Sequence, residues 1–88
     1  MKNVVLFMSN KCPECPPVIE KLDEMGIEYR KVDISNSMSE LREFLKYRDS
    51  KDFFVPVKDA GMAGVPTIMV NEEDFYNPTS LEDFSIFK

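Results

Sequence analysis

The sequence predicts an α/β domain in which about three helices pack on a four-stranded mixed sheet. An apolar run over residues 3–8, with adjacent valines, is typical of a central strand buried on both faces. Segments with helical spacing alternate with a second strand directly after it. A later apolar run that begins at Pro66 and ends in a polar turn predicts a hairpin. The expected order is strand, helix, strand, helix, then strand, strand, helix.

The first predicted helix follows the buried strand. Pro13 fits the first helical position, which makes Cys12 the expected N-cap. Apolar residues then recur on one stripe until Gly26 ends the helix. A second strand is expected within residues 27–34, so strand, helix and strand form one right-handed parallel unit.

The next helix is predicted over residues 37–49, because Ser37 and Glu40 form a capping box ahead of an amphipathic pattern. A proline and two glycines interrupt residues 50–64, where we expect one helical turn near residues 56–60. Four apolar residues in this segment are expected to be buried, namely Phe53, Phe54, Val55 and Val57.

The C-terminal part is predicted as a hairpin followed by a helix. Residues 66–70 form a strand, residues 71–74 a turn and residues 75–76 an edge strand. Thr79 and Glu82 suggest a second capping box, which would open a short terminal helix with Leu81 and Phe84 packed inward.

The bulk properties indicate a single domain over residues 1–88 and exclude some partners. The net charge of −5, without a basic cluster, argues against binding to nucleic acid or to an anionic membrane surface. The apolar run after the N-terminus is too short for a signal peptide or a membrane span. We therefore expect a cytoplasmic monomer that acts on a protein or a small molecule.

The two cysteines, Cys12 and Cys15, are the candidate catalytic residues. A disulfide across so short a loop would constrain the unfolded chain little, and the cytosol is reducing. The pair is therefore expected to have a chemical role rather than to form a structural disulfide. A helix N-terminus and the neighbouring Lys11 favour the thiolate that attacks disulfides at Cys12, whereas Glu14 opposes it. Cys15, one turn deeper, is placed to attack the resulting mixed disulfide. The spacing therefore predicts that Cys12 attacks and Cys15 resolves, with a reducing poise.

Two segments of the chain resemble glutaredoxin-like proteins of the thioredoxin superfamily. They are Cys12-Pro13-Glu14-Cys15 after the first strand and Gly64-Val65-Pro66-Thr67 at the start of a later one. The resemblance covers nearly the whole chain and implies a thioredoxin-like fold with a cis peptide bond before Pro66. It also implies that the backbone of Val65 pairs with glutathione or a substrate peptide as an extra strand.

The same resemblance implies further substrate-binding residues. Lys11 matches a position where glutaredoxins often carry a lysine near the glycine carboxylate of glutathione, and Pro13 and Glu14 lie between the cysteines. After residue 76, typical glutaredoxins carry two glycines and a Cys/Ser-Asp pair that hold glutathione, and this chain lacks that pattern. Thr79 or Ser80 could bind a carboxylate there instead.

The predicted function is that of a dithiol thiol–disulfide oxidoreductase that reduces disulfides of proteins or mixed disulfides of glutathione. No bound cofactor is expected. The electron donor is glutathione or a flavoprotein reductase, and the missing glycine pair slightly favours the reductase. One alternative is a module that binds a metal or an iron–sulfur cluster, although a zinc site would need more ligands than two Cys and no His provide. Another is a non-catalytic adaptor for protein contacts.

Some other side chains are expected to have a structural role only. Met8, Met25, Met38 and Met69 are expected in the core, and Met62 is expected to pack rather than to contact a substrate. Arg48 is expected to be a solvated charge on an exposed helix face.

Overall fold

A computed structural model describes residues 3–81 and 83–88 and contains the predicted mixed sheet. The strand order is β2-β1-β3-β4, with β1 parallel to β2 and antiparallel to β3, and with β4 antiparallel to β3. The bounds are Val4–Met8 for β1, Arg30–Asp33 for β2, Thr67–Val70 for β3 and Asp74–Tyr76 for β4. The α/β thioredoxin-like fold with a central first strand and a C-terminal hairpin is therefore confirmed.

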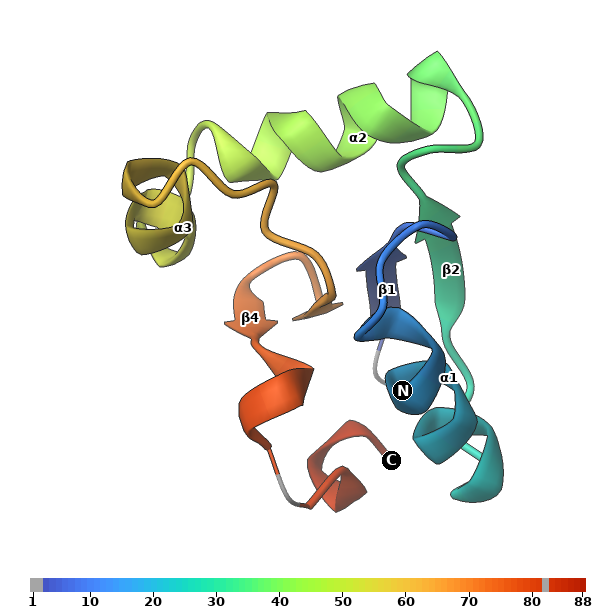
Figure 1. Ribbon diagram of the computed structural model, residues 1–88. Coiled ribbons are helices and arrows are strands. Elements are labelled where there is room, and N and C mark those ends of the chain that lie inside the picture. The colour runs from blue at the N-terminus through green and yellow to red at the C-terminus, as the bar shows by residue number, and fades with distance from the viewer. Residues whose placement is uncertain (1–2, 82) are drawn as a thin grey trace.

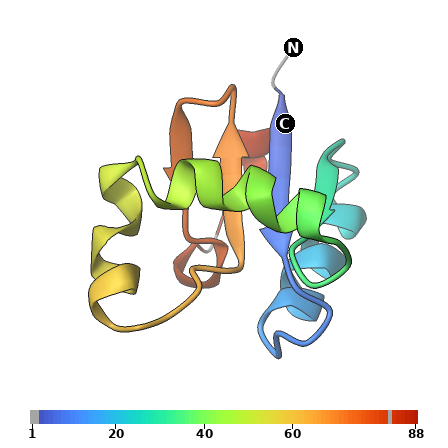
Figure 2. The same ribbon diagram turned by 90° about the horizontal axis from the view of Figure 1, so that it is seen from above.

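Helices cover both faces of this sheet (Figures 1 and 2). Helix α1, Cys15–Glu24, and the C-terminal turns lie on one face, and α2, Met38–Arg48, lies across the other. Helix α3, Val55–Asp59, is a short element beyond the end of α2. Within the described ranges, no helix is long and apolar enough to cross a membrane.

Two hydrophobic cores result, one on each face of the sheet. Alternate residues of β1 point to opposite faces, as the period of a strand requires, so Leu6 contributes to one core and Phe7 to the other. The α1-face core includes Leu6, Cys15, Val18, Leu22, Ile68 and Phe84. The α2-face core includes Val5, Phe7, Val32, Phe44, Tyr47, Phe54 and Met69. All five residues of β1 are buried, as its unbroken apolar run predicted.

Helix α1 begins later than predicted. Its first residue is Cys15 and its N-cap is Glu14, so Cys12 is not the N-cap and Pro13 is not the first helical residue. The reason is the pair Pro16 and Pro17, which lack N–H groups and therefore fit within the first helical turn, where those groups have no partner. Strand β2 is also shorter than expected.

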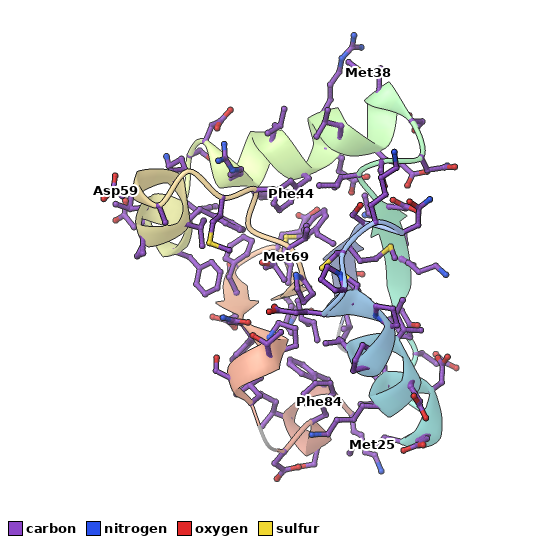
Figure 3. All side chains as sticks on the ribbon, viewed as in Figure 1. Met25, Met38, Phe44, Asp59, Met69 and Phe84 are labelled. Atoms are coloured by element: carbon purple, nitrogen blue, oxygen red, sulfur yellow. The ribbon has the colours of Figure 1, made fainter. Side chains whose placement is uncertain are left out.

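Helix α2 begins as predicted, with Ser37 as its N-cap. The Ser37 hydroxyl accepts the N–H of Glu40 at 3.2 Å. The Glu40 carboxylate accepts the N–H of Asp33 at 2.6 Å, which connects the start of α2 to the end of β2. Met38 is 64% exposed, so its predicted burial is wrong. Figure 3 shows Met38 at the outer end of α2, whereas Phe44 and Met69 lie in the interior.

The segment after α2 contains the predicted turn as α3, preceded by a 3₁₀ turn over Asp52–Phe54. Only Phe54 of the four apolar residues expected in the core is fully buried. Phe53 and Val55 are 37% and 42% exposed. Their predicted burial is wrong because the 3₁₀ turn and the short helix together offer one face to the core, and Phe54 occupies that place against Phe44.

The predicted terminal helix is replaced by two 3₁₀ turns, Pro78–Ser80 and Ser85–Phe87. The side chain of Asn77 accepts the N–H of Thr79 at 3.1 Å, so Asn77 is the cap that the sequence assigned to Thr79. Glu82, the other half of that capping box, lies outside the described residues. Phe84 still packs into the α1-face core, as expected.

Candidate redox site

The two cysteines differ sharply in exposure. Cys12 lies in the loop between β1 and α1 and is partly exposed. Cys15 is the first residue of α1 and is 0% exposed, because its side chain belongs to the α1-face core. The pair therefore consists of one accessible sulfur atom and one that substrate cannot reach directly.

Hydrogen bonds fix the loop that carries Cys12. The N–H of Cys12 donates to the Ser9 carbonyl at 3.0 Å, and the N–H of Lys11 donates to the Ser9 hydroxyl at 3.2 Å. The Ser9 hydroxyl lies 2.8 Å from that of Ser35, whose hydrogen bond to Asp33 lowers the pKa of the Asp33 carboxyl. The loop before Cys12 is thus connected to the turn that follows β2.

Burial raises the pKa of the Cys15 thiol to about 12, and a hydrogen bond to Cys12 contributes further. Cys15 is consequently a protonated thiol at neutral pH and can donate to the Cys12 sulfur. Cys15 is also the donor in the backbone hydrogen bond between the two residues, because its N–H donates to the Cys12 carbonyl at 3.4 Å. The arrangement places a proton donor beneath the accessible sulfur.

The segment before β3 has the cis peptide bond between Val65 and Pro66 that the resemblance implied. Pro66 is buried and Val65 is half-buried. Neither the N–H nor the C=O of Val65 makes a hydrogen bond to another backbone group of the described chain. These two groups are therefore available to an added strand.

The loop that leads to Val65 is held by Arg48, at the end of α2. Its Nε donates to the Ala63 carbonyl and its terminal Nη2 to the Met62 carbonyl, each at 2.7 Å. The expectation that Arg48 is simply a solvated charge is wrong. Two charge-assisted hydrogen bonds instead tie this loop to the end of the helix.

A groove of about 260 Å³ lies between this loop, α3 and the loop after β4. We call it the proline groove. It brings together four of the residues predicted to bind substrate, namely Glu14, Val65, Pro66 and Thr79. Apolar side chains complete it, namely Phe53, Pro56, Val57 and Met62. The predicted residues are thus adjacent in space although they come from three distant parts of the chain.

A second hollow, of about 390 Å³, lies along α1 and is lined in part by Pro13, Lys21 and Phe84. We call it the α1 groove. Glu14 and Thr79 line both grooves and so separate them. Lys11 and Ser80 are exposed and line neither groove. The structure therefore does not bring these two predicted residues together with the others.

Sequence reasoning assigned no substrate contact to the other seven lining residues of the proline groove, namely Phe53, Pro56, Val57, Met62, Gly64, Thr67 and Asn77. Met62 is 59% exposed, so its expected packing in the core is wrong. The sequence does contain a signal of this exposure. Met62 lies between Gly61 and Gly64, in a segment that glycines and a proline interrupt. Nothing in the local pattern distinguished Phe53 from the buried Phe54.

Possible metal ligands are sparse. The described residues include no group of three or more His, Cys, Asp or Glu side chains arranged to hold a metal ion.

The fold and the site together define a class. A CxxC pair between a central strand and its helix, beside a cis-proline before a neighbouring antiparallel strand, is the arrangement of thioredoxin-fold proteins. The sequence model of the glutaredoxin family matches residues 4–75. The chain belongs to the glutaredoxin family, which at the family level comprises thiol–disulfide oxidoreductases.

The chain is also similar to two other proteins. The chain is 32% identical over 74 residues to an uncharacterised protein of Haemophilus influenzae, covering 84% of this chain and 86% of the relative. It shares 16% identity and a TM-score of 0.51 with a buckwheat glutaredoxin solved in complex with glutathione. That match covers 77% of this chain and 54% of the buckwheat protein, and it supports the fold alone.

Proposed function

We propose that the protein is a dithiol thiol–disulfide oxidoreductase in which Cys12 attacks and Cys15 resolves. The observation that carries the proposal is the difference in burial between the two sulfur atoms. The accessible Cys12 can meet a substrate disulfide, whereas the buried Cys15 can meet only a sulfur already bound to Cys12. The raised pKa of Cys15 supports the same assignment, since it keeps the resolving thiol protonated until it is needed.

The reaction has two steps. The Cys12 thiolate attacks one sulfur of the substrate disulfide, forms a mixed disulfide and expels the other sulfur as a thiolate. Cys15 then loses its proton, attacks the Cys12 sulfur and releases the second substrate thiol. The substrate gains two electrons, and the protein keeps a disulfide between Cys12 and Cys15, which an external donor reduces.

The proposed substrates are disulfides of proteins and mixed disulfides of glutathione. The unpaired backbone groups of Val65 support pairing with an extended substrate, while Pro13, Glu14, Pro66 and Thr79 are proposed to contact it. Glutathione is included because the buckwheat glutaredoxin was solved with it. Lys11 and Ser80 remain proposed contacts for a substrate carboxylate near this edge.

The wider biochemical setting is also part of the proposal. Electrons come from glutathione or a flavoprotein reductase, and the chain works without a bound cofactor. It acts as a single-domain monomer in the cytoplasm, and it does not bind nucleic acid or membranes.

Steady-state reduction of a glutathione mixed disulfide and of insulin, each with both donor systems, tests this function. Cys12→Ser should abolish turnover with every substrate. Cys15→Ser and Cys15→Ala should retain the first step and accumulate a mixed disulfide on Cys12, which mass spectrometry detects. Full turnover by Cys12→Ser, or a mixed disulfide found on Cys15 of the wild type, would overturn the assignment of roles.

A further inference from the structure

We propose that the proline groove selects polypeptide disulfides in which a bulky apolar side chain lies beside the reacting cysteine, in preference to mixed disulfides of glutathione. This inference rests on the proposed function and names its substrate class. It is carried by the lining of the groove, by its charge and by the α1 groove that lies beyond Glu14.

The lining is apolar and partly unprotected. Phe53 and Met62 are 37% and 59% exposed, although both belong to residue types that are usually buried. Both line the groove together with Val57 and Pro56. An apolar side chain that enters the groove would remove this surface from water, which is favourable in proportion to the apolar area covered. The groove can therefore distinguish substrates by the side chain next to their cysteine.

The charge of the groove disfavours glutathione. Among the described residues that line it, Glu14 is the only charged one, and no lysine or arginine faces it. Glutathione carries two carboxylates and a net negative charge at neutral pH. An internal segment of a polypeptide carries no terminal carboxylate. Glu14 therefore repels the tripeptide and accepts a neutral or basic polypeptide segment.

The shape also favours a longer occupant. A segment that pairs with the N–H and C=O of Val65 lies extended along the loop. Glu14 and Thr79 line both the proline groove and the α1 groove, so a hollow continues on each side of the site. An extended polypeptide can follow both grooves, whereas a tripeptide bound at Val65 ends near the first.

The test uses single turnover, since the reduced protein itself supplies the two electrons. Four compounds are each linked through a disulfide to the same chromophoric aromatic thiol. They are pentapeptides with acetylated and amidated ends and with Phe, Ser or Asp beside a central cysteine, and glutathione. Cys12 attacks the peptide sulfur and expels the aromatic thiolate, whose absorbance gives the rate; Cys15 then releases the peptide thiol.

We expect the Phe peptide to react about tenfold faster than the Ser peptide, the discrimination that one apolar group in a pocket can provide. Glutathione and the Asp peptide should react more slowly than the Ser peptide. Equal rates for all four compounds would overturn the inference while leaving the proposed function intact. Release of no aromatic thiolate from any compound would instead overturn the proposed function.

Three serine variants test whether the apolar lining of the groove causes the difference in rate. Phe53→Ser and Met62→Ser should each reduce the Phe-to-Ser rate ratio several-fold. The circular dichroism spectrum of each variant should match that of the wild type, which shows that the variants are folded. Val55→Ser is the matched control, because Val55 is 42% exposed on the adjoining helix and does not line the groove. A Phe-to-Ser ratio that falls equally in all three variants would overturn the assignment to the groove.

Glu14→Gln tests the role of charge. It should raise the rate of glutathione relative to that of the Ser peptide, and an unchanged glutathione-to-Ser ratio would remove Glu14 from the inference.

Discussion

The two faces of the sheet are covered by different kinds of side chain. The α1-face core is largely aliphatic and contains the Cys15 thiol. The α2-face core is a network of aromatic rings, in which Phe44 lies 5.2 Å from Phe7 and 5.6 Å from Phe54 between ring centroids. The aromatic core also supports the loop before Pro66, since Gly64 lies against Phe54. The comparison shows that one face buries the Cys15 thiol, which is proposed to resolve the mixed disulfide, while the other supports the loop proposed to bind substrate.

Phe44→Ala tests this division most strongly. Removing a fully buried ring from the centre of the aromatic core should lower the free energy of unfolding by about 3–5 kcal/mol. Urea denaturation of the reduced protein measures this change. The fraction that remains folded should still form the disulfide between Cys12 and Cys15 at the wild-type rate. A rate lowered tenfold or more in that fraction would show that the two faces are not independent.

The pH dependence of stability tests the other face. The pKa of Cys15 is raised to about 12 in the folded protein, so the folded state holds its proton more tightly than the unfolded chain does. The resulting stability is fully present below about pH 8.5, the usual value of a free thiol. It should fall by up to about 1.4 kcal/mol for each pH unit between there and pH 12.

The measurement is chemical denaturation of the reduced protein from pH 7 to pH 11, with Cys15→Ala as the control. The slope above pH 9 should be shallower in the variant, because other groups titrate equally in both proteins. Identical slopes would mean that the thiol is not held protonated by its burial.

Gly64→Ala sharpens the role of the aromatic core in holding the loop. Gly64 has a φ of +107°, and an added Cβ would lie 3.2 Å from Phe54 and 3.3 Å from Val57. The substitution should cost about 1–3 kcal/mol through backbone strain and crowding. Gly61→Ala is the matched control, since its φ is +73° but nothing lies within 4 Å of the added Cβ. Thermal unfolding should show the larger loss for Gly64→Ala, and equal losses would exclude a contribution from packing.

The smallest expected effect concerns the surface pair that joins β2 to α2. Arg30 donates to both carboxylate oxygens of Glu43, and this hydrogen bonding lowers the pKa of Glu43. Glu43→Gln should cost only about 0.2–1 kcal/mol at pH 7, because both side chains are partly exposed. The difference from wild type should vanish as the pH falls below the lowered pKa of Glu43, where the carboxylate is protonated in both states. A difference that persists at pH 2 would assign the effect to packing instead.

Much of the fold followed from short-range rules. The unbroken apolar run of β1 predicted a central strand, and Ser37 predicted the start of α2, because both signals depend on few neighbours. The terminal helix failed because the Asn77 side chain caps a 3₁₀ turn two residues earlier than expected. The preference of a threonine such as Thr79 for the N-cap position is weak, and it is overridden when the side chain of a neighbouring residue caps the turn instead.

The candidate site was harder to predict than the fold. The two cysteines and the segment at Val65 were visible as motifs, but their geometry depended on where α1 begins, which Pro16 and Pro17 shifted to Cys15. The walls of the proline groove could not be predicted, since the exposure of Phe53 depends on the orientation of the 3₁₀ turn before α3. Such orientation is set by packing between distant segments, and the sequence pattern does not report it.

The contact between Arg48 and the Ala63 carbonyl joins two residues that are 15 positions apart. In polymer terms, this side chain closes the intervening segment into a ring, much as a reversible cross-link would. The ring contains the whole of α3, which cannot move far from α2 while the bonds to Arg48 persist. Opening of this segment should therefore occur as one cooperative event, visible as a common rate of amide hydrogen exchange across residues 49–62.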